Sequence, residues 1–208
     1  MSTSSQLLGR AAPIVAAAML FGACGSSSLD NTVSMSKLKD MSRQGQLWVY
    51  DAENGIVVAL DRLDEARDEY YRVRRQLKLA DKRIDAAEKR KNSMGVNVAE
   101  AWRDHLRALR KWAVARVRME RLGVLTSRAA VELAKAQVIQ REDLLGGKDF
   151  NVKEFADQLQ NLQERYTKRK KAVRKMRRYA RRQESRWRKM RMRYVAQSGD
   201  HDSGLWID

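Results

Sequence analysis

Apolar residues recur along three long segments of the chain, in steps that alternate between three and four residues. The first segment runs from Val49 to Ala87, the second from Val98 to Ala136 and the third from Val152 to Tyr194. Such steps place these side chains on one face of a helix, as in a heptad stripe. The sequence therefore predicts an all-α fold of three long helices, each ~45 residues and ~70 Å long at 1.5 Å per residue. Met35 and Leu38 continue the first stripe backwards, so the start of the first helix stays open.

Two short segments separate the stripes and predict turns. Asn, Ser and Gly cluster between Lys91 and Asn97, and Gly146 and Gly147 follow the second stripe. Asn151 followed by Glu154 is similar to a capping box at the start of the third helix. Short turns between long helices favour an antiparallel, coiled-coil-like bundle. The alternative is a pair of helices from which the third projects.

The second segment has a wider apolar face than the other two. Trp102, Leu106, Leu109 and Ala113 flank its heptad stripe. A wide apolar face suits a helix that contacts two partners. The second helix is therefore expected to contact two partners.

Charge is distributed unevenly along these helices. The chain carries a formal net charge of +17, which indicates an anionic partner or surface. Sixteen Lys and Arg residues lie between Arg165 and Arg193, and Glu184 is the only acidic residue among them. The candidate contacts with an anionic partner are Arg174, Lys175, Arg177, Arg178, Arg181, Arg182, Arg186 and Arg188.

Three interpretations of this basic segment compete. It is a solvated face whose charge is screened by salt, or a contact for an anionic envelope component, or a site for nucleic acid. The envelope component would be lipid head groups, lipopolysaccharide, peptidoglycan or an acidic protein. Nucleic acid would need Tyr179, Trp187 and Tyr194 as stacking platforms. These aromatic residues are instead expected in the core, which disfavours nucleic acid.

The N-terminus carries a different signal. Residues 11–23 are nearly all apolar and uncharged and follow Arg10, as in a secretory signal peptide. The run is too short to span a membrane as a helix. The sequence LFGAC, Leu20 to Cys24, resembles the lipobox of bacterial lipoproteins, and the whole plan resembles the small helical lipoproteins of bacterial envelopes. The resemblance implies cleavage before Cys24 and acylation of its thiol, as by palmitate. Gly25 in place of aspartate implies the outer membrane, facing the periplasm.

These signals give four expected regions. They are a signal peptide (1–23), a lipid-anchored tether with an uncertain helix start (24–46), the three-helix domain (47–197) and a flexible tail (198–208). The Gly- and Ser-rich sequence after Cys24 predicts flexibility in the tether.

The sequence has no motif for catalysis, metal or cofactor binding. With one cysteine and two histidines it offers no Cys/His metal set, and it has no glycine-rich phosphate loop. We therefore expect no enzymatic activity and no cofactor. The expected function is a lipid-anchored spacer or adaptor that holds an anionic partner ~70 Å from a membrane. The alternative is a soluble helical nucleic-acid-binding protein.

Overall fold

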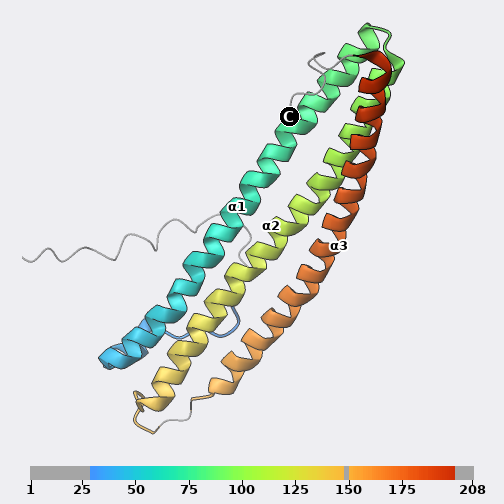
Figure 1. The fold of residues 1–208 in the computed structure, drawn as a ribbon. Coiled ribbons are helices and arrows are strands. Elements are labelled where there is room, and N and C mark those ends of the chain that lie inside the picture. Colours follow the sequence, from blue (N-terminus) through green and yellow to red (C-terminus); the bar gives the residue numbers. More distant parts are fainter. Residues whose placement is uncertain (1–28, 148–149, 200–208) are drawn as a thin grey trace, which may run out of the picture.

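The computed structural model describes residues 29–147 and 150–199, which form three long helices and one short 3₁₀ helix (Figure 1). No strand occurs in these ranges, so the prediction of an all-α fold is confirmed. The elements are η2 (Met35–Leu38), α1 (Arg43–Lys89, 47 residues), α2 (Ser93–Arg141, 49 residues) and α3 (Val152–Ser198, 47 residues).

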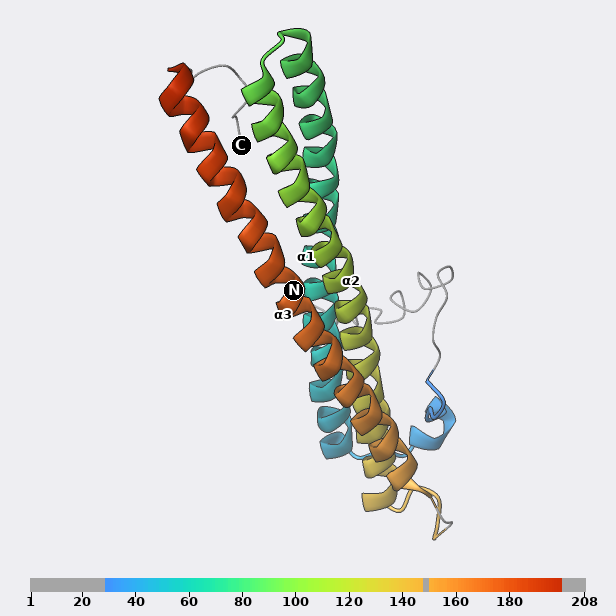
Figure 2. The ribbon, with the colours of Figure 1, turned by 90° about the vertical axis from the view of Figure 1, so that its right-hand side faces the viewer.

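The three long helices form an open layer in which α2 lies in the middle. Helix α2 packs along both α1 and α3, whereas the described parts of α1 and α3 do not contact each other (Figures 1 and 2). Because α2 runs antiparallel to both, the expected up-down-up order is confirmed. Helix α3 packs against α2 and does not project from a two-helix pair.

Two stripes on α2 explain this arrangement. The predicted stripe from Val98 to Ala136 packs on α3 and includes Trp112, Met119 and Leu122. A second stripe packs on α1. It consists of Val117, Val124, Val131 and Val138, which recur every seven residues. The wide apolar face of α2 is predicted from the sequence, but this valine series is not.

The heptad stripes of the outer helices form the other half of each interface. Every predicted stripe residue of α1 from Val49 to Ala87 is buried or half-buried. The stripe of α3 has fewer buried residues than that of α1 and includes two polar residues, Arg169, which is exposed, and Gln183, which is half-buried. The buried residues of α3 are Phe155, Leu162, Val173, Ala180, Trp187 and Tyr194.

The turn between α1 and α2 is tighter than the sequence predicts. Helix α2 begins at Ser93, so residues 94–97 are helical and not part of the turn. The reason is a cap, because Asn92 Oδ1 accepts a hydrogen bond from the Gly95 amide at 2.8 Å. After α2, Gly146 and Gly147 have φ of +61° and +74°, the left-handed conformation expected of them.

The predicted capping box at α3 is only partly correct. Asn151 occupies the N-cap position, but its side chain makes no capping hydrogen bond with the helix backbone. Its Nδ2 instead donates to Glu154 Oε1 at 2.7 Å. The two predicted residues therefore interact through their side chains alone.

The segment before α1 packs against the helices. Leu29 joins a cluster around Leu122 and Leu162, and the Val33 amide donates to Glu132 Oε2 at 2.6 Å. The Asn31 amide donates to Gln158 Oε1 of α3 at 2.9 Å. The chain from residue 29 to 32 was expected in the flexible tether, so this packing differs from expectation.

Several predicted features lie outside the described residues. They are the signal peptide (1–23), the lipidation site Cys24 and the tail beyond Gly199. Within the described ranges, no helix combines the length and hydropathy needed to cross a bilayer.

Candidate anion-binding surface

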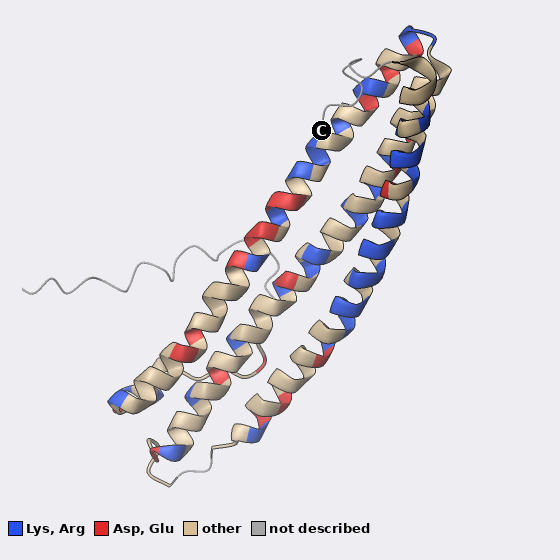
Figure 3. Cartoon of the chain, in the orientation of Figure 1, with Lys and Arg blue, Asp and Glu red and all other residues tan. Residues whose placement is uncertain are grey.

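The eight predicted contact residues lie on the C-terminal half of α3 and form a strongly basic surface (Figure 3). Seven of the eight are exposed, and only Arg177 is half-buried. Since the heptad stripe occupies one side of α3, the remaining sides present these cations to solvent. The structure thus brings the predicted residues together on one edge of the layer.

Three of the eight are engaged within the protein, and one of these is Arg182, whose guanidinium lies 6.0 Å from the centroid of the Tyr179 ring. The Arg177 guanidinium lies over the Trp112 ring of α2, 4.3 Å from its centroid. Arg188 Nη2 pairs with Glu184 Oε1 at 2.7 Å. Arg177 therefore helps to dock α3 on α2 by a cation–π contact, and it is less available to a partner than the sequence predicts.

The acidic residues of α1 do not neutralise the basic half of α3. Glu65 and Glu69 both pair with Arg116 of α2, at 3.1 and 2.6 Å. Within the described residues, no ion pair joins α3 to either of the other helices. The excess positive charge of α3 is therefore left for solvent ions or a partner.

The aromatic residues of this region divide into two groups. Trp187 and Tyr194 are buried, as expected of core residues. Tyr179 is 47 % exposed, so its assignment to the core is wrong. It sits one position before the buried Ala180, on the side that turns away from α2, with Arg182 6.0 Å from its ring centroid.

His105 is a packed residue of the α2–α3 interface. Its ring stacks on Trp187, with centroids 6.2 Å apart and planes at 5°. His105 Nδ1 lies 3.2 Å from the Ala180 carbonyl oxygen. Because a carbonyl only accepts, Nδ1 carries the proton and donates it. Burial is the main cause that lowers the pKa of His105, which favours the neutral ring.

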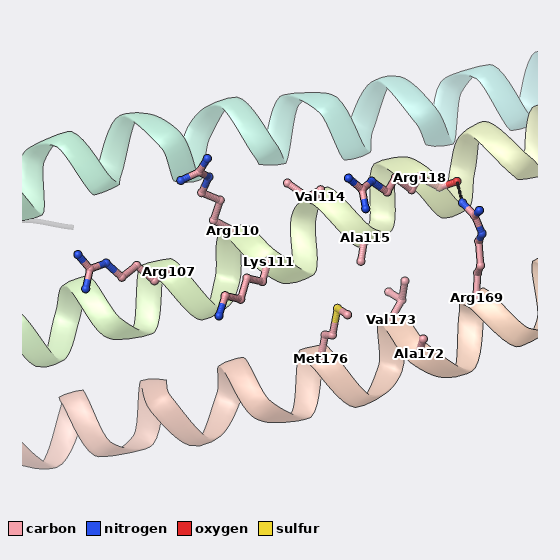
Figure 4. Close-up of a pocket in the computed structure, with 10 residues that line it drawn as sticks. All are labelled: Arg107, Arg110, Lys111, Val114, Ala115, Arg118, Arg169, Ala172, Val173 and Met176. Atoms are coloured by element: carbon pink, nitrogen blue, oxygen red, sulfur yellow. Dashed lines mark hydrogen bonds between the residues drawn. The ribbon is translucent and has the colours of Figure 1, made fainter. Parts of the chain in front are cut away.

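A groove of about 800 Å³ lies between α2 and α3 beside this surface (Figure 4). Lys111 and Ala115 of α2 point toward α3, and Val173 and Met176 of α3 point toward α2. Arg169 Nη1 donates to the Arg118 carbonyl oxygen at 3.2 Å and ties the two helices together at one end of the groove. The full lining is Arg107, Arg110, Lys111, Val114, Ala115, Arg118, Arg169, Ala172, Val173 and Met176.

The α2 side of this groove is not predicted by the sequence pattern. The basic segment of α3 is dense, whereas Arg107, Lys111 and Arg118 are spread over three turns of α2. A signal was present, because Lys111 and Arg118 are seven residues apart and flank the predicted stripe. The spacing of Lys111 and Arg118 indicates a groove only when the neighbouring helix is known to be α3.

The described residues hold no cluster of three or more His, Cys, Asp or Glu side chains that would bind a metal ion. Comparison with models of protein families, with curated proteins and with solved structures finds no match to this chain. A functional hypothesis therefore rests on the chemistry of the surface itself.

Proposed function

We propose that this protein is a lipid-anchored adaptor of a bacterial envelope whose basic α3 binds an anionic envelope partner. The partner would be peptidoglycan, lipopolysaccharide or an acidic protein. The observation that carries the proposal is the excess positive charge of α3, which forms no ion pair with α1 or α2 in the described structure. The lipobox-like sequence ending at Cys24 supplies the anchor.

The shape of the protein supports binding to an extended surface. Helix α3 has 47 residues and is ~70 Å long at 1.5 Å per residue, and its cations lie along half of that length. Each basic residue close to an anionic membrane surface contributes about 1 kcal/mol of attraction. Several exposed arginines acting together therefore suffice for adsorption without a shaped pocket.

The packed N-terminal segment changes the expected geometry of anchoring. Leu29 packs against the cluster of Leu122, Ala129 and Leu162, and Leu122 lies near the middle of α2. The five residues from Cys24 to Leu29 span at most ~18 Å. A lipid on Cys24 would therefore hold the layer beside the middle of α2. We propose an adaptor that lies close along the membrane, in place of a spacer that stands ~70 Å away.

Radiolabelled palmitate tests the anchor. Label should enter the protein in the membrane fraction and should be lost in Cys24→Ser. Unlabelled protein in the cytosol would contradict the envelope assignment.

A charge-matched pair of variants tests the role of α3. The first replaces six exposed or half-buried cations of α3 with glutamine, and the second replaces six exposed cations of α1, so the net charge changes equally. The α3 set is Arg174, Lys175, Arg177, Arg178, Arg181 and Arg182. The α1 set is Arg72, Arg74, Arg75, Lys78, Lys82 and Lys89.

Only the α3 variant should lose binding to isolated cell wall or lipopolysaccharide. Binding of the parent should fall as salt rises past about 0.2 M, because exposed charges are screened over ~8 Å at physiological ionic strength. Equal losses in both variants would show that net charge alone, and not the location of the cations on α3, determines binding.

Tyr179 favours nucleic acid as a second candidate partner. An exposed aromatic ring with an arginine beside it resembles a base-stacking platform. This candidate requires unlabelled, cytosolic protein that binds single-stranded nucleic acid. Tyr179→Ala should then weaken binding by about 1–3 kcal/mol, as for loss of one stacked base.

A further inference from the structure

We infer that the groove between α2 and α3 is a binding site for one anionic lipid, with its head group on the arginines and lysine of the rim and an acyl chain on the apolar floor. The inference extends the proposed envelope function, since it adds a second site and names the chemistry of its ligand. None of the eight cations of the α3 surface lines this groove, although four of the residues that line it also lie on α3.

The rim of the groove selects for negative charge. Five of its ten lining residues are Arg or Lys and none is acidic. In the described residues no carboxylate lies within ion-pair distance of Arg110, Lys111 or Arg118, and Arg107 pairs with its neighbour Asp104 at 3.6 Å. Cations of three successive turns of α2 thus line one space, and Arg107 alone among them has a counter-charge in the described residues, so an anionic head group is the complementary ligand.

The floor of the groove selects for an apolar group. Its other five residues are Val114, Ala115, Ala172, Val173 and Met176. Met176 is 41 % exposed, although it points toward α2 and lies beside the buried seam. A hydrophilic anion alone would leave this surface in water, whereas an amphiphile covers it and gains ~25 cal/mol for each Å² removed from water. The volume of about 800 Å³ lies within the ~300–1,000 Å³ usual for ligand pockets.

The groove lies on the same side of α2 as the segment that leads to Cys24. Lys111, Arg118, Leu125 and Glu132 are spaced by seven residues and share one side of the helix. Lys111 and Arg118 line the groove, Leu125 packs against the same buried cluster as Leu29, and Glu132 accepts a hydrogen bond from the Val33 amide. A membrane held by an anchor on Cys24 would therefore face the groove. This continuity favours a lipid over a wall polymer as its occupant.

Binding of a monomeric short-chain lipid tests the inference in the full chain carrying Cys24→Ser. The probe is dihexanoyl phosphatidylglycerol below its critical micelle concentration, followed by titration calorimetry. The expected result is saturable binding at one site. Glycerol phosphate lacks the chains and dihexanoyl phosphatidylcholine lacks the net charge, so each should bind at least about tenfold more weakly, which corresponds to about 1.4 kcal/mol.

Variants on each wall separate the two halves of the site. Lys111→Gln combined with Arg118→Gln should weaken lipid binding about tenfold, since each removes a charge-assisted contact. Met176→Gln should weaken it severalfold. The matched controls are Arg165→Gln with Lys171→Gln, which remove two exposed charges of α3 outside the groove and outside the eight-cation surface, and Met192→Gln, at a side chain 72 % exposed. The controls should bind within about twofold of the parent, as exposed surface changes usually do.

Three outcomes would overturn the lipid site. Equal losses in the groove and control variants would mean adsorption by net charge. Binding of glycerol phosphate as tight as that of the lipid would mean an anion site without a chain. Tight binding of an acidic amphipathic peptide without lipid binding would assign the groove to a protein. None of the six α3 residues replaced in the cell-wall experiment lines the groove, so each proposal fails or survives separately.

Discussion

The two grooves that flank α2 are alike in size and differ in the charge of their lining. The groove between α1 and α2 has a volume of about 740 Å³, and both signs of charge line it: Glu65, Asp68, Glu69, Arg72, Arg75 and Arg116, with Tyr71. The groove between α2 and α3 measures about 800 Å³ and has only cations and apolar residues. Similar heptad stripes thus join the helices on both sides. The charged residues beside the stripes differ: in the α1–α2 groove cations and carboxylates of the protein can pair, whereas the cations of the α2–α3 groove can bind an external anion.

The polar contacts across the two interfaces differ in the same way. Arg116 bridges α2 to two carboxylates of α1, and Arg103 Nη1 lies 4.0 Å from Asp81 Oδ1. Contacts between α2 and α3 instead use neutral groups or π systems, such as His105 with the Ala180 carbonyl and Arg177 with Trp112. Helix α3 also carries many like charges, which repel one another along a helix. We therefore expect α3 to separate from α2 more readily than α1 does.

Loss of the Trp187 side chain should cause the largest difference in stability between the α2–α3 and α1–α2 interfaces. Trp187 is 8 % exposed and fills the α2–α3 seam against Trp102 and His105. Trp187→Ala removes a large buried side chain, which typically costs about 3–5 kcal/mol. Hydrogen exchange should show that amides of α3 lose protection first and those of α1 keep theirs.

Tyr179→Ala serves as the control, because Tyr179 is a large aromatic residue of the same helix but half exposed. It should leave exchange nearly unchanged. Uniform loss of protection across all three helices in Trp187→Ala would mean that the layer unfolds as a single unit and that the two interfaces are not independent.

A pair of glycine substitutions tests how closely α1 approaches α2. A Cβ atom on Gly45 would lie 2.8 Å from Val138 Cγ1 and 2.6 Å from Glu142 Oε1. Val138 is fully buried and has no room to move, so Gly45→Ala should destabilise the protein by about 1–3 kcal/mol.

Gly55 is the control within the same helix, because nothing lies within 4 Å of its Cβ position. Gly55→Ala should stabilise the protein by up to about 1 kcal/mol through helix propensity. Thermal melts should therefore move in opposite directions. A stabilising Gly45→Ala would mean that α1 and α2 are further apart at this end than described.

Replacing one α2 cation in each groove compares their electrostatics directly. Arg116→Gln removes two ion pairs and leaves the half-buried Glu69 without its partner, so a loss of about 1 kcal/mol is expected after allowance for solvent screening. Lys111→Gln relieves repulsion among cations and should change stability by less than about 0.5 kcal/mol. Denaturant midpoints measure both. Added salt should shrink the difference, and an equal cost for both substitutions would contradict the contrast between the grooves.

Much of the fold follows from residue patterns that are local in the sequence. The stripe of α1 predicts its buried face from Val49 to Ala87, and the two glycines after α2 adopt the left-handed conformation that their sequence suggests. Helix lengths are likewise close to those expected. These features depend on spacing within one segment, so a single sequence carries them.

The features that escaped prediction depend on contacts between segments. The valine series from Val117 to Val138 is the weaker of two stripes on α2, and its role is evident only beside α1. The docking of Leu29 and Val33 was hidden by the polar residues around them, which suggested a tether. Lys111 and Met176 form one groove because α2 and α3 are neighbours in a particular register. No periodicity within one helix contains that information.

The smallest expected effect is the dependence of the α2–α3 interface on pH. His105 is buried and neutral, and burial lowers its pKa more than its hydrogen bond to Ala180 and the nearby Glu184 raise it. Arg177 and Arg188 lower it further. An unfolded histidine has a pKa near 6.5. Below that value the unfolded chain binds more protons than the folded one, so stability is lost as the pH falls through about 6.5 toward the folded pKa.

The measurement is the denaturant midpoint at pH 7.5 and at pH 5.5 for the parent and for His105→Gln, in which an amide N–H replaces the donor to Ala180. The parent should lose stability on acidification, and the variant should lose less. Both proteins retain His201, and both retain Glu120. Burial raises the pKa of Glu120, so the contribution of Glu120 to stability is lost as the pH rises. These groups therefore cancel in the comparison. A variant with the same acid sensitivity as the parent would assign the titration to a group outside the seam, and the α2–α3 interface would then resemble the α1–α2 interface in its response to pH.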